Sequence, residues 1–417
     1  MVLAWVAAAM VLVAVPAAAP AVTPAPSRVY VANFRVSTVS VIDPATNAVV
    51  ATVLVGGGPS GVAVSPNGTR AYVANQNSSS VSVIDTATNA VLVTVPVGSS
   101  AVGVTVSPDG TRAYVTKSTT NNVAVIDTTT NTVIATVSVG ASPSGVAISA
   151  DSSRVYVTNL LSNDVSVINT ASNTVVATVP VGIRPVDVAL SSGRARAYVT
   201  NLSSKNVSVI DTATNTVVAT VPLAGFASGV AVSPDGSRAY VTNYDASHLL
   251  SVIDTATNTV VADIAVAGGV RPVRVAVSPD GSRAYVTNQA TNNVSVIDTA
   301  ANAVVATVPV QTEPLGVAVT PSVPGPADTV PPSCAVSGVV LGPPKQQQVT
   351  VQDSGTGSSG LKEIRNIRIR NGTVSVAPFT PGTTGPVVVM ATKANQGRPT
   401  VWSFDAVDVA GNLTHCA

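Results

Sequence analysis

A tetrapeptide of apolar and polar residues, Tyr-Val-(Thr/Ala)-(Asn/Lys), recurs along most of the chain. Its tyrosines are 42 residues apart five times and 45 residues apart once, at Tyr30, Tyr72, Tyr114, Tyr156, Tyr198, Tyr240 and Tyr285. Each tetrapeptide is accompanied by three further Val-rich runs, such as Val207–Ile210, Val217–Val221 and Gly229–Val232. Short runs of β-branched residues separated by turn residues predict four strands in every unit.

Two kinds of turn connect these strands, which we name a, b, c and d from the inside outwards. Ser-Pro-Asp-Gly, as at Ser233–Gly236, joins a to b, and Asp-Thr-Ala-Thr-Asn, as at Asp211–Asn215, joins c to d. Pro and Gly preset a tight reversal, and Asp and Asn side chains hydrogen-bond their own backbone. A period of about 40–45 residues with four strands per unit is typical of a β-propeller.

The phase of the repeat predicts how the ring closes. The array begins on a b strand at Arg28 and ends on an a strand at Gly316–Val319, so that seven strands of each of these types occur. We therefore predict an all-β, seven-bladed propeller over residues 28–321, in which the last a strand completes the first blade in a one-plus-three closure. Such a closure hides strand edges that would otherwise favour aggregation.

The repeat ends at a Pro-rich linker, residues 322–332, and residues 333–417 follow a different pattern. Turn clusters there separate five predicted strands: Gln348–Gln352, Ile364–Ile369, Val374–Val376, Val387–Met390 and Val401–Val407. This arrangement predicts a small β-sandwich. One region is basic, through Lys362, Arg365, Arg368 and Arg370. It would either protect a solvated sheet edge, which we favour, or contact an anionic wall polymer or another subunit.

The first residues predict export. Residues 1–21 combine an apolar run, Val2–Val15, with small residues that suit a signal-peptide cleavage site, and residues 22–27 form a short linker. No Lys or Arg precedes Arg28, which is unusual for a signal peptide. A retained membrane anchor is the alternative, although the run is short for a full span. We expect a secreted, extracellular or cell-wall-associated protein without a membrane span after cleavage.

The two cysteines, Cys334 and Cys416, lie near the two ends of the C-terminal domain. In an exported protein such a pair predicts one disulfide, and two free thiols are the alternative. A disulfide that closes the 81 residues between them would add about 4 kcal/mol by the chain-entropy relation.

Composition excludes several classes of function. Charged residues make up 10% of the chain and the net charge is +1, so no overall field attracts nucleic acid. The two histidines, His248 and His415, are too few for a His-based metal site or repeated haem ligation. Aromatic residues are only 3% of the chain. Lectins and proteins that bind single-stranded nucleic acid usually stack their ligands on aromatic side chains, so both classes are disfavoured. We predict a monomer with no metal, no cofactor and no nucleic-acid partner.

The repeat from Arg28 to Pro321 resembles the YVTN family of β-propellers, which occurs in surface-layer proteins and in exported YncE-like proteins of bacteria and archaea. Lys117 replaces the usual Asn of the tetrapeptide, and Asn169 replaces an Asp of the c–d turn. The resemblance implies export and the binding of a ligand or partner, without one agreed activity. Asp408–Asn412, Asp-Val-Ala-Gly-Asn, is similar to the end of Ig-like modules in bacterial secreted proteins and implies an Ig-like sandwich over residues 333–417.

Most propeller charges repeat with the units. Arginines open the b strands at Arg28, Arg70, Arg112, Arg154, Arg196, Arg238 and Arg283, and aspartates close the c strands at Asp43, Asp85, Asp127, Asp211, Asp254 and Asp298. Because b and c are antiparallel neighbours, we expect Arg–Asp pairs that brace the blades on one face. Asp109, Asp151, Asp235 and Asp280 are a–b turn residues.

Ten charges that do not follow the repeat lie in b–c loops, in d–a loops or at the start of strand a, on the opposite face: Arg35, Lys117, Asp164, Arg184, Asp187, Lys205, Asp245, Arg271, Arg274 and Glu313. Asp187 and Arg274 stand where the other units have Gly, at the start of the innermost strand. In three units a charged residue precedes this position by three: Arg184, Arg271 and Glu313.

These residues predict an anion-recognising patch of Arg184, Arg271 and Arg274, with Asp187 and Glu313 setting specificity. The guanidinium fork suits carboxylate or phosphate because it donates two parallel hydrogen bonds. The alternative is an Asp187–Arg274 ion pair that stabilises the channel, or loop charges without a role.

Tyr244, Asp245 and His248 form a secondary group on the same face. His248 is a candidate general acid or base, or a solvated loop histidine. We favour a binding scaffold over an enzyme: a secreted or cell-surface propeller that binds a ligand, a surface protein or a wall polymer on its b–c/d–a loop face. A hydrolase or lyase of the propeller-lactonase kind, acting at the channel mouth, is one alternative, and a structural surface-layer component is another. The sequence assigns no catalytic residue and names no ligand.

Overall fold

The structure is a computed structural model. It describes residues 27–321 except residues 192, 245–248 and 267, together with seven strands between residues 333 and 416. Residues 25–323 form one compact unit, and the C-terminal strands belong to another. The predicted signal peptide, residues 1–21, lies outside the described residues. In the part of the chain that is described, no helix is long and apolar enough to span a membrane.

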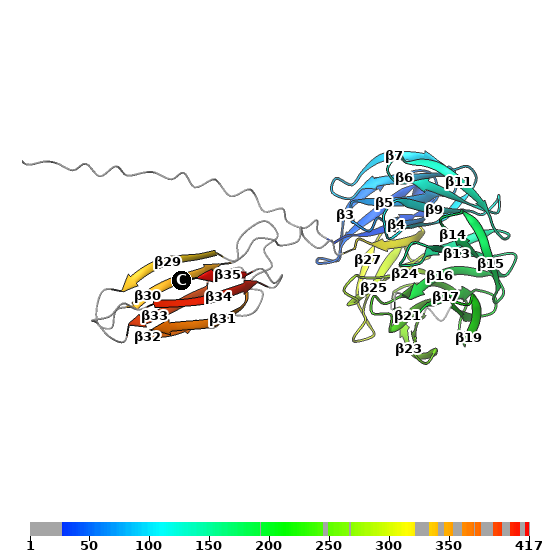
Figure 1. Cartoon of the computed structure of the whole chain (residues 1–417). Coiled ribbons are helices and arrows are strands. Elements are labelled where there is room, and N and C mark those ends of the chain that lie inside the picture. Colours follow the sequence, from blue (N-terminus) through cyan, green and yellow to red (C-terminus); the bar gives the residue numbers. More distant parts are fainter. Residues whose placement is uncertain are drawn as a thin grey trace, which may run out of the picture. The chain divides into compact units, whose positions relative to one another are not determined.

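The strands β1 to β28 form seven four-stranded antiparallel sheets, the blades of a propeller (Figure 1). Blade 1 consists of β28 (Pro314–Val319), β1 (Val29–Asn33), β2 (Thr38–Asp43) and β3 (Ala48–Leu54). Blade 2 consists of β4 (Pro59–Val64), β5 (Arg70–Asn75), β6 (Ser80–Asp85) and β7 (Ala90–Pro96). Blade 3 consists of β8 (Ala101–Val106), β9 (Arg112–Lys117), β10 (Asn122–Asp127) and β11 (Thr132–Ser138). Blades 4 and 5 are β12 (Pro143–Ile148), β13 (Arg154–Asn159), β14 (Asp164–Asn169) and β15 (Thr174–Pro180); and β16 (Pro185–Ser191), β17 (Arg196–Asn201), β18 (Asn206–Asp211) and β19 (Thr216–Pro222). Blades 6 and 7 are β20 (Ala227–Val232), β21 (Arg238–Asn243), β22 (Leu249–Asp254) and β23 (Thr259–Ala265); and β24 (Pro272–Val277), β25 (Arg283–Asn288), β26 (Asn293–Asp298) and β27 (Ala303–Pro309).

The ring closes between the two ends of the repeat array. The last strand, β28, pairs with β1 in the order β28-β1-β2-β3, with Val31 opposite Val317. The Arg28 backbone N–H donates to Thr320 Oγ1 at 2.8 Å, and the Phe34 N–H, in the short 3-10 helix η1 (Phe34–Val36), donates to the Glu313 carbonyl at 2.9 Å. The predicted seven-bladed propeller with one-plus-three closure is confirmed.

The tyrosine of the tetrapeptide makes contacts between blades, and the asparagine makes contacts between strands of one blade. Tyr30 is fully buried between blades 1 and 2, and its hydroxyl donates to Asn89 Oδ1 in the c–d turn of the next blade at 3.1 Å. Burial raises the pKa of Tyr30 to about 12. Within a blade, Asn159 Nδ2 on strand b donates to Ser166 Oγ on strand c at 2.9 Å. The first contact joins blades, and the second joins strands.

The threonine of the tetrapeptide joins neighbouring a strands. Thr116 Oγ1 accepts the Gly103 N–H at 2.8 Å in its own blade and donates to the Ser144 carbonyl of blade 4 at 2.7 Å. Thr158, Thr200, Thr242 and Thr287 make the same pair of contacts in blades 4 to 7. Blades 1 and 2 have alanine at this place. We call this contact the threonine clasp.

The outermost d strands form the rim of the propeller. Each has a β-bulge at an apolar residue that is about half exposed: Val50, Leu92, Ile134, Val176, Val218, Val261 and Val305. A bulge interrupts the regular row of backbone groups that another strand needs for pairing. The rim is therefore apolar, but its hydrogen-bonding edges are irregular.

The C-terminal unit contains two antiparallel sheets. One has the order β29 (Ser333–Val340), β30 (Gln346–Gln352), β33 (Val387–Lys393), β32 (Gly372–Val376), and the other the order β31 (Leu361–Arg370), β34 (Val401–Asp408), β35 (Leu413–Cys416). All five strands predicted from the sequence are present and longer than predicted, and β29 and β35 are additional. The Ig-like character of this unit stays a prediction. So does the Cys334–Cys416 disulfide: β29 and β35 contact each other, but the described residues do not include these side chains.

The threonine clasp should be measurable in the stability of the propeller. Thr116→Val leaves the Gly103 N–H and the Ser144 carbonyl without this partner, so the free energy of unfolding should fall by about 1–3 kcal/mol. Denaturant unfolding followed by circular dichroism measures the change. Thr136→Val makes the same substitution at an exposed position of β11 and should alter stability by less than about 0.5 kcal/mol. Equal effects of the two substitutions would show that the clasp contributes nothing.

Candidate functional site

The two ends of the propeller differ in what their loops contain. The a–b and c–d turns lie at one end, the turn face, and the b–c and d–a loops lie at the other, the loop face. The described propeller begins at residue 27 and ends at residue 321, both on the turn face, because β1 starts there and β28 ends there.

Repeated charges on the turn face have internal partners. Four Arg–Asp pairs connect strands b and c of one blade: Arg28–Asp43, Arg196–Asp211, Arg238–Asp254 and Arg283–Asp298. Two other arginines reach the next blade instead. Arg70 donates to the Thr128 carbonyl at 2.7 Å, and Arg112 donates to the Thr170 carbonyl. The predicted Arg–Asp bracing is confirmed for four blades, whereas in blades 2 and 3 the arginine bonds to a backbone carbonyl of the next blade.

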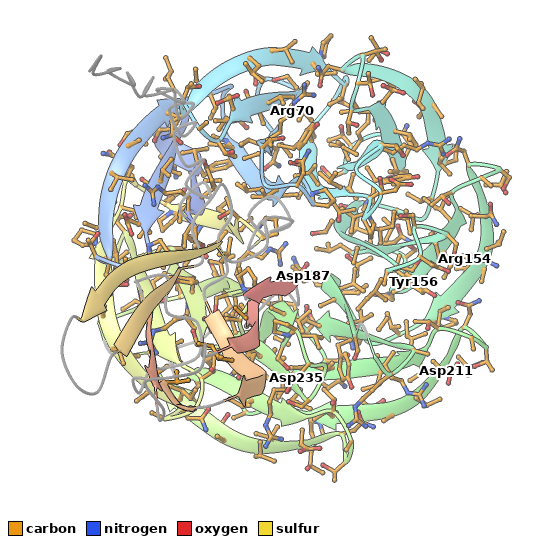
Figure 2. All side chains as sticks on the ribbon, turned by 60° about the vertical axis from the view of Figure 1, so that its left-hand side comes forward. Arg70, Arg154, Tyr156, Asp187, Asp211 and Asp235 are labelled. Carbon is orange, nitrogen blue, oxygen red and sulfur yellow. The ribbon has the colours of Figure 1, made fainter. Side chains whose placement is uncertain are left out.

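Arg154 is the exception among the seven arginines that open the b strands. Its side chain makes no hydrogen bond or ion pair with other described residues. Figure 2 shows Arg154 and Asp211 toward the rim of the ring, and Asp187 near its centre.

The central channel is tight because five of its seven innermost strands have glycine as their third residue. Seven equivalent residues form a ring, the channel ring: Gly61, Gly103, Gly145, Asp187, Gly229, Arg274 and Gly316. A Cβ atom added to Gly103 would lie 2.4 Å from the Ser144 carbonyl oxygen, and one on Gly316 would lie 2.3 Å from the Ser60 carbonyl oxygen. Neighbouring strands therefore exclude side chains at these places. The remaining cavity is about 240 Å³, and its lining includes six of the seven ring residues, all but Gly229, together with valines next to them.

Asp187 and Arg274 form an ion pair within the channel. Arg274 Nη1 lies 3.3 Å from Asp187 Oδ2 and 3.3 Å from the Ser228 carbonyl oxygen. Asp187 Oδ2 also accepts the Val230 N–H at 3.1 Å. The two side chains are 17% and 22% exposed. Burial raises the pKa of the Asp187 carboxyl above its usual range, and the Arg274 guanidinium partly opposes this shift.

The pair spans three innermost strands, since Asp187 is on β16, Val230 on β20 and Arg274 on β24. Sequence reasoning offered this pair as the alternative to an anion-binding role for Arg274. In the structure, the carboxylate that Arg274 meets is part of the protein.

Arg184, Arg271 and Glu313 share an unusual backbone conformation. Their φ angles are 58°, 57° and 55°, in the left-handed region that most side chains avoid. The Arg184 N–H donates to Asn163 Oδ1, and the Glu313 N–H donates to Asn292 Oδ1, both at 2.9 Å. The fold thus fixes the backbone at this point of the loop.

The side chains at these three positions do not converge. Glu313 pairs with Arg35 at 3.0 Å, across the closure of the ring. Arg184 and Arg271 are exposed, and neither side chain makes an ion pair with another described residue. The five predicted site residues therefore separate into an internal pair, Glu313 with its closure partner Arg35, and two exposed arginines. Whether any of them binds a ligand stays a prediction.

Tyr244 is part of a second arrangement on the loop face. Its hydroxyl donates to Gln289 Oε1 at 2.8 Å, and the Arg271 guanidinium carbon lies 5.9 Å from the centre of its ring. Asp245 and His248, the other members of the predicted secondary group, lie outside the described residues. The candidate acid–base role of His248 therefore stays a prediction.

Sequence reasoning missed a partner for Phe226. Lys205 Nζ lies 4.5 Å from the centre of the Phe226 ring. Both residues stand out from the repeat pattern, but one belongs to the b–c loop of blade 5 and the other to the d–a loop before blade 6. Which loops touch across two blades is not visible in a repeat alignment. The described residues also contain no cluster of three or more His, Cys, Asp or Glu side chains suited to a metal ion.

The comparisons with known proteins agree with the fold. The model of the YNCE-like beta-propeller family matches residues 2–324. The chain belongs to the YNCE-like β-propeller family. The comparison with curated proteins gave no match.

Three solved structures are similar to this YNCE-like propeller. Hydrazine synthase of Kuenenia stuttgartiensis has a TM-score of 0.57 at 24% identity, over 62% of this chain and 88% of that chain. A functionally unknown protein from Desulfotomaculum acetoxidans has a TM-score of 0.64 at 18% identity, over 70% and 99%. The dihydro-heme d1 dehydrogenase NirN in complex with DHE has a TM-score of 0.56 at 16% identity, over 73% and 77%. At these identities the likeness shows the fold alone.

A double-mutant cycle should detect the channel pair of this YNCE-like propeller. Alanine fits at both positions, because a Cβ is already present. Asp187→Ala leaves Arg274 partly buried without its carboxylate, and Arg274→Ala leaves Asp187 without its cation. The double variant should therefore lose less stability than the sum of the two single losses, with a coupling of about 1 kcal/mol or more. Urea unfolding at neutral pH measures all four proteins. Additive losses would mean that the pair does not form in solution.

Proposed function

We propose that this protein is an exported β-propeller scaffold that binds a ligand or protein partner on its loop face. The observation that carries the proposal is the unequal use of charge at the two ends of the propeller. On the turn face, most repeated charges bond to the protein itself. On the loop face, Arg184, Lys205 and Arg271 make no ion pair with described residues.

Exposed cations alone are weak evidence, because loop charges vary freely. Two further features support a role for these ones. Lys205 and Arg271 each lie over an aromatic ring, and aromatic residues are rare in this chain. In addition, Arg184 and Arg271 stand at a backbone position whose left-handed conformation the fold imposes. The direction in which each side chain leaves the backbone is therefore fixed.

The covalent connections of the propeller also favour the loop face. Residues 27 and 321, the two ends of the described propeller, both lie on the turn face. The loop face therefore holds neither end of the described propeller. The tightly packed channel ring supports these loops on a rigid base, which reduces the ordering cost of binding.

Export and location belong to the same proposal. Residues 1–21 act as a signal peptide, a disulfide joins Cys334 to Cys416, and the mature protein is secreted and associates with the cell surface or wall. The sequence pattern at the N-terminus and the family membership support this part.

Export can be tested directly. Expressed with its own N-terminus in a bacterial host, the protein should be recovered outside the cytoplasm with a new N-terminus after residue 17 or residue 21, because small residues precede both points. Cell fractionation and N-terminal sequencing provide the measurement. A full-length protein that stays in the membrane fraction would contradict cleavage and favour a retained anchor.

Binding at the loop face can be tested with matched variants. The mature protein is screened against metabolites, glycans and peptides by thermal shift, and each ligand that stabilises it is tested again with Arg184→Glu/Arg271→Glu and with Arg154→Glu. The loop-face variant should lose the stabilisation and the turn-face variant should retain it. A ligand that depends only on Arg154, or that both variants bind as wild type does, would contradict the proposed face.

A further inference from the structure

The loop end of blade 6 holds most of the aromatic side chains that the repeat does not explain. In the described propeller, the aromatic residues outside the tetrapeptides are Phe34, Phe226 and Tyr244. Phe226 ends the loop that leads into β20, and Tyr244 follows β21. Blade 6 therefore has an aromatic ring at each of its two loops on this face.

Each of these rings meets a cation from a neighbouring blade. Lys205 comes from blade 5 and lies 4.5 Å from the centre of the Phe226 ring, and Arg271 comes from the start of blade 7 and lies 5.9 Å from the centre of the Tyr244 ring. Gln289 of blade 7 holds the Tyr244 hydroxyl at 2.8 Å. The loops of three blades thus hold one cation on each side of blade 6. We call Lys205, Phe226, Tyr244 and Arg271 the blade 6 cation–aromatic site.

An aromatic ring orients a cation without neutralising it. The ring attracts the positive charge through its face, while the N–H groups of the ammonium or guanidinium stay available as donors. Neither the Lys205 ammonium nor the Arg271 guanidinium donates a hydrogen bond to another described residue. Toward the described residues, both are therefore oriented donors whose charge is not neutralised, the condition under which an added carboxylate binds with little ordering cost.

The described carboxylates of the loop face do not compensate these cations. Asp187 pairs with Arg274, and Glu313 pairs with Arg35. Asp164 accepts from Asn159 Nδ2 at 2.6 Å and from Ser162 Oγ at 3.2 Å. Among the described carboxylates, these three therefore leave the charge of Lys205 and Arg271 without compensation.

Apolar side chains accompany the cations. Phe226 is 39% exposed, and on the loops of blades 4 and 5 Leu161 is 67% exposed and Ile183 is 57% exposed. Arg184 follows Ile183 directly. A phosphate polymer would use the cations and leave these apolar groups in water, whereas a polypeptide can offer both carboxylates and apolar side chains.

The channel is a poorer place for such a partner. Its cavity of about 240 Å³ is smaller than the roughly 300–1,000 Å³ of ordinary small-molecule sites, and Asp187 already occupies its one described arginine. The partner would lie across the loops rather than enter the ring.

We propose that the blade 6 cation–aromatic site binds an acidic polypeptide segment that also carries apolar side chains. Its carboxylates accept hydrogen bonds from Lys205 and Arg271, and its apolar side chains pack on Phe226 and toward Ile183. This inference rests on the proposed function of the loop face and names the chemical class of the partner.

The test uses a fluorescently labelled copolymer of glutamate and leucine as the probe, with labelled polyphosphate for comparison, and the mature full-length protein. Anisotropy titrations at low and high salt give the Kd of each. The copolymer should bind more tightly than polyphosphate. Lys205→Ala/Arg271→Ala should raise the Kd for the copolymer tenfold or more, and Arg154→Ala on the turn face should leave it unchanged.

A second variant separates the apolar contribution from the charge. Phe226→Ser should raise the Kd for the copolymer at least threefold and should raise the Kd for polyphosphate less. Asp245 lies outside the described residues beside Tyr244, so Asp245→Asn is included and should bind at least as tightly as wild type. Thermal melts confirm that each variant is folded.

The outcomes distinguish this inference from the proposed function. If polyphosphate binds more tightly than the copolymer, or if the Lys205/Arg271 variant keeps the wild-type Kd, the inference is wrong. If the copolymer does not bind while another ligand still depends on Arg184 and Arg271 in the thermal-shift test, the inference fails and the loop-face function stands. If no ligand depends on the loop face, both fail.

Discussion

The seven innermost strands approach one another so closely that the space between them determines what the rest of the propeller can be. At five positions of the channel ring, the neighbouring backbone leaves no room for a Cβ atom, as at Gly103 and Gly316. The threonine clasp spans the same gap in five blades, because one hydroxyl accepts from strand a of its own blade and donates to strand a of the next blade. Geometry and hydrogen bonding thus act on the same contact, and each blade is positioned by its neighbour rather than by its own strands alone.

This dependence of each blade on its neighbour explains how the propeller is held together with so few charged residues. The tetrapeptide supplies one side chain for each layer: tyrosine for the junction with the next blade, threonine for the channel ring and asparagine for strand c. Arginine and aspartate on the turn face are likewise used within or between blades. The repeat therefore consumes most of its own polar groups. Apart from Asp187 and Arg274 in the channel ring, the charged residues that differ between units lie mainly in the loops of the loop face.

The sequence predicted the architecture well, because period, turn chemistry and phase are properties of the chain order. The closure of β28 onto β1 follows from the array starting on strand b at Arg28. The candidate site was less predictable. Sequence position places a residue on a face, but Glu313 turns to Arg35 and Arg271 lies over Tyr244. These choices depend on which loops of different blades touch, and a repeat alignment treats each blade separately.

Asp187 and Arg274 show how the ring limits the position of a ligand. Both depart from glycine, and each needs the other because the channel keeps them largely from water. Their contacts with the Val230 N–H and the Ser228 carbonyl connect three of the innermost strands, β16, β20 and β24. Asp187 and Arg274 bond to each other within a cavity of about 240 Å³, so little room is left there for a ligand. The binding that we propose is therefore assigned to the loops above the ring, where Arg184 and Arg271 are exposed at a backbone position in the left-handed conformation.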